Sequence, residues 1–265
     1  MNFSIKGYLE TSFSDWPGKI ASVLFLPSCN FRCPYCHNHR LALQPESYPD
    51  IPWPVIREDL EKRLGWIDGV CLTGGEPALH PWLTDLIREI RAVGGKHHGP
   101  ALQVKLDTNG SRPEVLKRLI SENLVDYVAM DVKAPLEAGR YHGITGGSPG
   151  NGAGDDEAER RIDAVRKSVE ILLAADIDFE FRTTVVPGFI EEEEIYDLAR
   201  RLGGAPRYTI QGFKPADAMS ENLRALPPVP ASRVEEMQRR VDEWMGRKPA
   251  TRPRTAELAA EEARP

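Results

Sequence analysis

Three of the four cysteines lie close together near the start of the chain and could bind a metal. Cys29, Cys33 and Cys36 form a C-x3-C-x2-C pattern within the stretch CNFRCPYCHN. A disulfide uses two thiols and a closed zinc site usually has four ligands, so three thiolates leave one coordination position open. Soft thiolates select zinc or an iron–sulfur cluster. The pattern therefore favours either a cubane cluster with one free iron or a zinc ion with a fourth ligand from elsewhere.

The fourth ligand of such a zinc site would be His37, His39 or Cys71. Zinc sites commonly combine one C-x2-C pair with a second, and this sequence has no second pair, which favours the cluster. Cys71 lies in the apolar stretch GVCLTGG, where a free cysteine is most often a small buried hydrophobic residue. We therefore expect Cys71 to belong to the core.

Short polar motifs end several β-type stretches of the sequence. In GGEP, the two glycines that precede Glu76 would let the backbone approach a ligand closely, although a tight turn explains them as well. The motif DTNG contains a favoured Asn-Gly turn pair. Asp107 could also join Asp131 in an oxygen cluster for a cation, provided that each residue ends its strand.

Charged residues also occur within the β-type stretches. Asp131 and Lys133 share one side of a strand, because strand side chains alternate between faces. They form either an ion pair at the rim of the sheet or a binding site for a ligand carboxylate. Arg182 lies within FEFRTTVVPG and needs a carboxylate partner or a wet site, since an unpaired buried charge is costly.

The chain alternates β-type stretches with segments of helical periodicity. The predicted strands are 22–28, 69–75, 103–110, 127–135, 179–188 and 207–215, and the apolar residues of the predicted helices fall in 56–67, 83–90, 115–119, 162–172, 195–202 and 234–244. Such alternation predicts a parallel sheet wrapped by helices, either doubly wound or an incomplete β/α barrel. In both folds, chemistry belongs at the carboxyl ends of the strands, where the polar motifs fall.

Composition limits the class of protein and its partners. The 265 residues are 41% hydrophobic and 28% charged, which fits one compact domain or at most two. A net charge of −6 argues against a protein that binds nucleic acid through its phosphates. The start of the chain lacks the pattern of a signal peptide, and no apolar run approaches the ~20 residues of a membrane helix. We expect a cytoplasmic protein with reduced thiols.

Two segments are expected to lie outside the regular structure. The segment 143–161 is rich in glycine and then in charge, which predicts a loop between the fourth strand and its helix. The tail 246–265 has little apolar content and is expected to be disordered, so the folded domain should comprise residues 1–245.

CNFRCPYCHN fits the C-x3-C-x-aromatic-C signature of the radical S-adenosylmethionine (SAM) superfamily, and GGEP matches the second motif of that superfamily. The chain resembles the activating proteins of anaerobic ribonucleoside-triphosphate reductase. The similar stretches also include SDWPGK, LDTNG, MDVKAP, RTTVVPG and QGFKP. The chain is more distantly similar to the pyruvate formate-lyase activating enzyme. The resemblance covers roughly residues 1–245 and explains neither the glycine-rich segment nor the tail.

The resemblance implies a partial (β/α)6 TIM-like barrel and a [4Fe–4S] cluster on Cys29, Cys33 and Cys36. SAM would chelate the open iron of that cluster. One electron, from a donor such as flavodoxin or ferredoxin, would then cleave SAM to methionine and a 5′-deoxyadenosyl radical. That radical would take a hydrogen atom from a glycine of a partner, a glycyl-radical enzyme. The cluster and SAM would carry the hard chemistry, and the protein would position them.

The same resemblance assigns roles to individual residues. Gly74, Gly75 and Glu76 would receive the methionine amino group of SAM. Lys133 would approach the carboxylate of SAM, and Tyr35 would lie by the adenine. The expected catalytic residues are the three cysteines and Lys133. Asp107, Asn109, Asp131 and Arg182 complete the expected cofactor-binding set. Asp107, Thr108 and Asp131 also match the ligands of a monovalent cation in activators of the formate-lyase type.

Three alternatives remain open at this point. The chain could activate another glycyl-radical enzyme, of the pyruvate formate-lyase type. It could act on a small molecule, as a deazapurine synthase does with the same CxxxCxxC and GGEP motifs. Outside the enzymes, a zinc-stabilised binding module would explain the cysteines, but it would leave the alignment of GGEP, DTNG and DVK on one rim as a coincidence.

Overall fold

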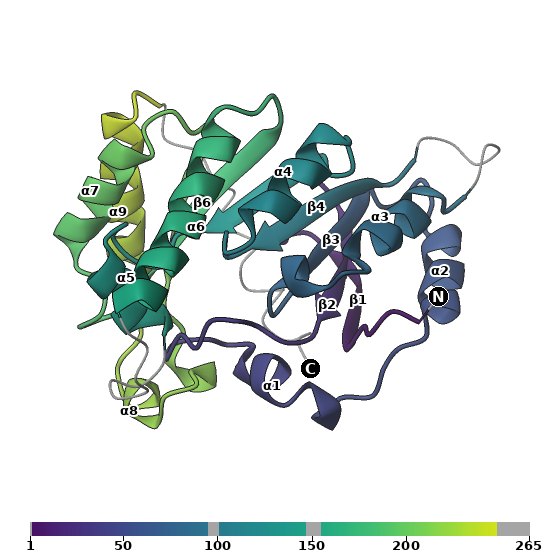
Figure 1. Ribbon diagram of the computed structural model, residues 1–265, viewed down its shortest axis with the longest axis horizontal. Helices are drawn as coiled ribbons and strands as arrows, with labels where there is room; N and C mark the ends of the chain where they lie inside the picture. The colour runs from purple at the N-terminus through teal and green to yellow at the C-terminus, as the bar shows by residue number, and fades with distance from the viewer. Residues whose placement is uncertain (1, 95–100, 147–154, 248–265) are drawn as a thin grey trace.

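The structure is a computed structural model that describes residues 2–94, 101–146 and 155–247. It contains a seven-stranded sheet whose strands follow one another in chain order (Figure 1). The strands are β1 (Gly7–Ser12), β2 (Ala21–Leu26), β3 (Gly69–Gly74), β4 (Gln103–Thr108), β5 (Tyr127–Asp131), β6 (Asp178–Val185) and β7 (Tyr208–Gly212).

The six strands from β2 to β7 are parallel and correspond to the six predicted strands. The pairings run in order from β1 to β7, which gives the open, partial barrel that we expected. β1 was not predicted; it pairs antiparallel with β2 as an edge strand. Its sequence GYLETS is polar and half-exposed, so it lacks the apolar content by which the other strands were found.

Helices lie along the outside of the sheet, with α3, α4 and α6 crossing in front of it in Figure 1. They are α1 (His39–Leu43), α2 (Trp53–Lys62), α3 (Leu83–Arg91), α4 (Pro113–Ser121), α5 (Ala138–Thr145), α6 (Asp155–Leu173), α7 (Glu192–Arg201), α8 (Glu221–Arg224) and α9 (Ala231–Trp244). Six of these correspond to the predicted periodic segments, although α2 ends at Lys62, before the last residues of 56–67, and α7 ends at Arg201, one residue before the end of 195–202. Sequence analysis missed α1, α5 and α8, which are short and offer too few turns for a period to show.

The two predicted irregular segments are only partly described. Both ends of 143–161 are helical, because α5 ends at Thr145 and α6 begins at Asp155, so the loop is shorter than expected. The middle of that segment lies outside the described residues. So does most of the predicted tail, beyond Arg247, whose backbone amide donates to the Asp242 carbonyl at 2.8 Å.

The two faces of the sheet differ in chemistry. Val104, Leu106 and Met130 belong to the buried hydrophobic cluster that joins the sheet to the helices. Lys105 and Asp107 alternate with them along β4, so polar and charged side chains line the inner side of the curved sheet. This pattern places titratable groups inside the barrel, below the rim where the strands end.

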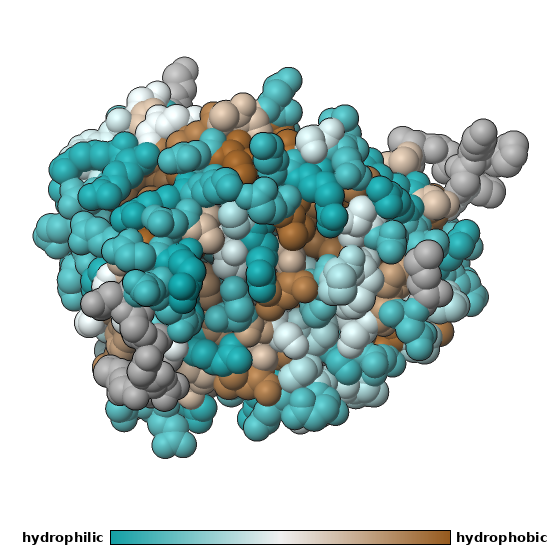
Figure 2. Space-filling model, viewed as in Figure 1, coloured by the Kyte–Doolittle hydropathy of each residue, from teal (hydrophilic) through white to brown (hydrophobic). Residues whose placement is uncertain are grey.

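Hydrophilic residues cover most of the face in Figure 2, and hydrophobic residues show mainly between the helices. Among the described residues, every helix is too short or too polar to cross a membrane.

Candidate active site

The cysteines lie on the loop between β2 and α1, which we call the cysteine loop (residues 27–38). In Figure 1 this purple segment leaves β2 and crosses to the side of α5 and α8 before it returns to α1. The Arg32 amide donates to the Thr145 carbonyl, and the Ser220 amide donates to the Pro34 carbonyl, each at 2.8 Å. The loop thus bridges the first and last parallel strands across the open rim.

All three cysteines of the loop are free thiols that are largely shielded from water. Cys33 is buried, and Cys29 and Cys36 are partly buried. Burial raises the pKa of Cys29 to about 11 and that of Cys33 to about 12, and it also raises the pKa of Cys36. The thiols are therefore protonated near neutral pH, and an incoming metal must displace their protons.

The DTNG turn contacts the cysteine loop directly. The Asn109 side-chain amide lies 3.7 Å from the Cys29 sulfur and donates to Asn30 Oδ1 at 3.1 Å. The Ser111 hydroxyl donates to the same oxygen at 3.2 Å. Asn109 was a predicted site residue, whereas Asn30 and Ser111 were not.

The two glycines of GGEP allow a close approach between backbones. A Cβ on Gly75 would lie 1.8 Å from the Ser28 carbonyl oxygen, and one on Gly74 would lie 2.4 Å from that of Leu26. The Gly75 amide donates to Leu26 at 2.9 Å, and the Glu76 amide donates to Ser28 at 2.8 Å. In the structure, the backbone that approaches these two glycines is the end of β2 and the start of the cysteine loop.

Glu76 is fully buried and ties β3 to the end of β4. Its carboxylate accepts hydrogen bonds from the Asn109 amide at 2.6 Å, the Thr108 hydroxyl at 2.8 Å and the Ala78 amide at 3.0 Å. Desolvation outweighs these hydrogen bonds and raises the pKa of Glu76 to about 7. The predicted contact of Glu76 with an amino group thus has to compete with three protein donors.

Arg182 joins two carboxylates on the inner side of the sheet. Its Nε donates to Asp131 at 2.8 Å, and its Nη1 lies 3.3 Å from Asp107. Asp131 also accepts from the Lys133 ammonium at 2.8 Å. The expected carboxylate partner of Arg182 therefore exists, and it belongs to the protein.

Of the three predicted cation ligands, Asp107 and Asp131 both contact Arg182, and Thr108 lies apart from them. Asp107 pairs with Lys105 and Arg182 and accepts from the Thr73 hydroxyl at 3.1 Å. Thr108 follows Asp107 on the strand and therefore points to the opposite face, where its hydroxyl donates to Glu76.

Lys133 connects this charged group to the cysteine loop. Its ammonium acts on Cys33 and Cys36, lowering their pKa against the larger effect of burial. Its backbone is held by two tyrosines: Tyr35 donates to the Lys133 carbonyl at 3.3 Å, and the Lys133 amide donates to the Tyr141 hydroxyl at 3.3 Å. The predicted adenine neighbour Tyr35 is buried at this contact.

Sequence reasoning missed four residues of the site. They are Asn30, Lys105, Ser111 and Tyr141. Lys105 had a usable signal, because it precedes Asp107 by two residues and must share its face of the strand. Tyr141 had none, since it comes from α5, which was itself not predicted.

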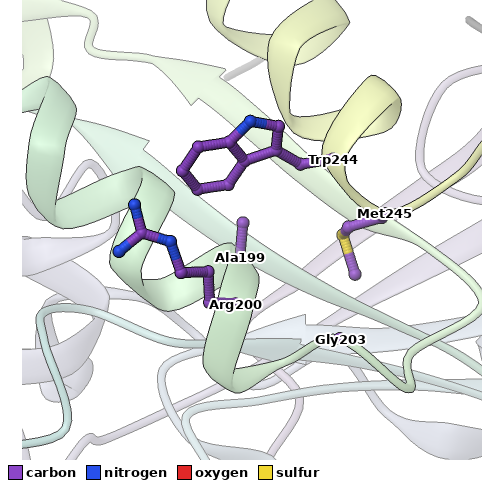
Figure 3. A pocket seen from close by; sticks show the side chains of 5 residues that line it. All are labelled: Ala199, Arg200, Gly203, Trp244 and Met245. Atoms are coloured by element: carbon purple, nitrogen blue, oxygen red, sulfur yellow. The ribbon is translucent and has the colours of Figure 1, made fainter.

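A surface hollow of about 360 Å³ lies away from the rim, between α7 and α9 (Figure 3). It is lined by Ala199, Arg200, Gly203, Trp244 and Met245. The guanidinium of Arg200 stacks 4.4 Å from the centre of the Trp244 ring. This hollow carries no pair of groups suited to acid–base or redox chemistry, so the candidate active site remains at the rim.

Comparison with known proteins identifies the family of this chain. The Radical SAM superfamily matches residues 23–202, which span β2 to the end of α7 and include the whole candidate site. The chain belongs to the radical SAM superfamily. Members of this superfamily are enzymes that use SAM and a [4Fe–4S] cluster. This membership excludes the zinc-stabilised binding module.

Two similar proteins have names that give different activities. A protein of Methanocaldococcus jannaschii, whose name provisionally assigns it to the glycyl-radical enzyme activating enzymes, is 31% identical over 237 residues, or 89% of this chain and 91% of the relative. A 7-carboxy-7-deazaguanine synthase of Methanopyrus kandleri is 35% identical over 129 residues, which cover 40% of this chain and 46% of the relative. The first similarity extends over nearly the full chain and the second does not.

A solved structure shares the fold. SuiB of Streptococcus suis, crystallised with S-adenosylmethionine, superposes with a TM-score of 0.54 at 13% identity, over 84% of this chain and 49% of SuiB. The chain thus spans about half the length of that structure, and the likeness is one of fold.

Proposed function

We propose that this protein is a glycyl-radical enzyme activating enzyme. Its substrate would be a glycine of a partner protein, with anaerobic ribonucleoside-triphosphate reductase as the first partner to test. The observation that carries the proposal is a three-thiol loop that bridges the barrel rim and is held there by GGEP and DTNG. The similarity to the M. jannaschii relative over 89% of the chain supports the choice of partner class.

The donor set fits the cofactors that this function needs. Cys29, Cys33 and Cys36 would hold three irons of a [4Fe–4S] cluster and leave the fourth open for SAM. Bound there, the cluster would supply the electron for reductive cleavage of the SAM sulfonium, the chemistry on which hydrogen abstraction depends. Lys133 would pair with the SAM carboxylate, because its ammonium lies beside the cysteine loop.

The protein's own residues would position and shield these groups. Asn109 would orient Cys29 through its side-chain amide. Gly74 and Gly75 would let the cysteine loop lie close to the end of β3. Tyr35 and Tyr141 would fix the backbone of Lys133. The largely buried cysteines imply a site from which water is mostly excluded.

The test is anaerobic reconstitution with iron and sulfide, followed by reduction and an assay for 5′-deoxyadenosine from SAM. We expect a cluster signal in electron paramagnetic resonance that shifts when SAM is added. Addition of the reductase should then produce a glycyl radical on that partner. SAM cleavage without any glycyl radical on candidate partners would reject the activating role and leave the superfamily chemistry intact.

Cys33→Ala tests the cluster assignment. This variant should lose bound iron and sulfide while it keeps its circular dichroism spectrum, because Cys33 lies on a loop. Cys71→Ala is the matched control: Cys71 is buried in β3, so iron content should stay while stability falls. Equal iron and sulfide in Cys33→Ala and the unmodified protein would contradict the assignment.

A second candidate is a small-molecule radical SAM enzyme, favoured by the partial similarity to the deazaguanine synthase. It predicts product formation from a small substrate with no protein partner. Mass spectrometry of reactions with and without the reductase separates the two candidates.

A further inference from the structure

Lys105 is a buried lysine to which the proposed reaction assigns no role. Its side chain lies inside the partial barrel with 1% of its surface exposed. Its ammonium pairs with Asp107 and lies 3.7 Å from the Cys71 sulfur and 6.0 Å from the centre of the Tyr127 ring. Burial by itself would lower the pKa of Lys105, but Asp107 and Cys71 outweigh it and raise that pKa, so the ammonium stays charged.

The ammonium begins a continuous series of ion pairs. Lys105 pairs with Asp107, which pairs with Arg182 from β6. Arg182 pairs with Asp131 of β5, and Asp131 pairs with Lys133 beside the cysteine loop. This series connects the Lys105 ammonium to Lys133 through Asp107, Arg182 and Asp131.

Two of the expected ligands of a monovalent cation, Asp107 and Thr108, already interact with groups of the protein. The Asp107 carboxylate is occupied by Lys105, Arg182 and Thr73, and the Thr108 hydroxyl faces Glu76. A free Na⁺ or K⁺ would have to displace the Lys105 ammonium from Asp107, and Lys105 is part of β4. The residues present therefore do not fit an exchangeable cation.

We propose that the Lys105 ammonium is the resident monovalent cation of this barrel. Lys105 is a positioning residue: it neutralises Asp107 and, through Arg182 and Asp131, holds Lys133 in place. The consequence for SAM rests on the proposed function, whereas the consequence for the folded protein without SAM does not. Neither the Tm of the unmodified protein nor its affinity for SAM should depend on added Na⁺ or K⁺.

The first experiment uses the unmodified full chain. Its Tm as isolated, and its affinity for SAM after reconstitution, are measured in NaCl, KCl, NH4Cl and choline chloride at one ionic strength of about 0.1 M. We expect one Tm throughout and SAM affinities within about twofold of one another. A higher Tm or a larger SAM affinity in Na⁺ or K⁺ than in choline would overturn the proposal.

The second experiment uses Lys105→Met, in which a thioether side chain of similar length replaces the ammonium. In choline, the SAM affinity of the variant should fall on the order of tenfold or more, because Asp107 loses a buried partner. NH4⁺, which fits the vacated place, should restore most of that loss and raise the Tm. K⁺ should restore less, and Lys105→Arg should remain independent of the salt.

Lys167→Met is the matched control, because the Lys167 ammonium forms an exposed ion pair with Glu114. It should show no dependence on the cation. The proposal fails if Lys105→Met binds SAM normally in choline, or if it is weakened equally in all four salts. If Lys105→Met does not fold, the measurements of the unmodified protein in the four salts still test the proposal. If the unmodified protein binds no SAM, the proposed function fails, and the Tm series still tests Lys105.

Discussion

At the scale of single residues, Glu76 is a carboxyl group placed where water cannot reach it. Three protein donors hold it between β3 and the DTNG turn. Desolvation nevertheless raises its pKa to about 7 from an ordinary value of 4.5. The folded state thus prefers the protonated form, so the contribution of Glu76 to stability is present below pH 4.5 and is lost as the pH rises to about 7.

Glu76→Gln should remove this dependence. The amide cannot titrate, so between pH 4.5 and about 7 the unfolding free energy of the variant should fall less than that of the unmodified protein. Urea unfolding of both proteins across this range measures the difference. Glu61→Gln, in an exposed ion pair with Arg57, should leave the profile unchanged. Parallel pH profiles for Glu76→Gln and the unmodified protein would contradict the assignment.

At the scale of elements, the end of β3 and the start of the cysteine loop touch through their backbones. Gly75 makes this contact possible, because any Cβ there would lie 1.8 Å from the Ser28 carbonyl oxygen. Since that obstacle is backbone, a rotamer change cannot relieve it. The loop must move, and with it Cys29.

Gly75→Ala should therefore destabilise the protein by about 1–3 kcal/mol and reduce iron retention after reconstitution. Gly139→Ala offers the contrast, because Gly139 lies in α5 and a Cβ there would meet nothing within 4 Å. That variant should gain about 0.5–1 kcal/mol, since alanine is the better helix former. Urea unfolding and iron content measure both effects, and equal stabilities of the two variants would disprove the steric argument.

At the scale of the whole molecule, the cysteine loop joins two sides of an open barrel. It contacts α5 through Arg32 and the segment before α8 through Ser220. A ligand that binds this loop should therefore stabilise segments far apart in the sequence. We expect an outer helix such as α4 to respond less.

Hydrogen exchange can test this coupling. With the cluster loaded and SAM at about ten times its dissociation constant, the amides of Arg32 and Ser220 should exchange roughly tenfold more slowly, if they open only in the unbound form. The Leu116 amide of α4 serves as the reference. Uniform slowing of all three amides would show global stabilisation, and no slowing at the first two would reject the bridge.

Local sequence patterns were sufficient to predict the superfamily and the order of the parallel strands. The C-x3-C-x2-C spacing, the strand-ending motifs and the β/α alternation are local patterns, so they predicted the parallel strands, the rim and the superfamily. Cys71 was correctly assigned to the core, because its apolar neighbours already show burial.

Which side chains and backbone groups face one another follows from the packed fold. Spacing could not show that Gly75 makes room for Ser28, that Glu76 is enclosed by protein donors, or that Arg182 joins Asp107 and Asp131. These contacts join segments about 30 to 50 or more positions apart, and their geometry follows from strand register and barrel curvature. Local sequence patterns carry no information on register between strands, so the identity of each partner depended on the packed fold.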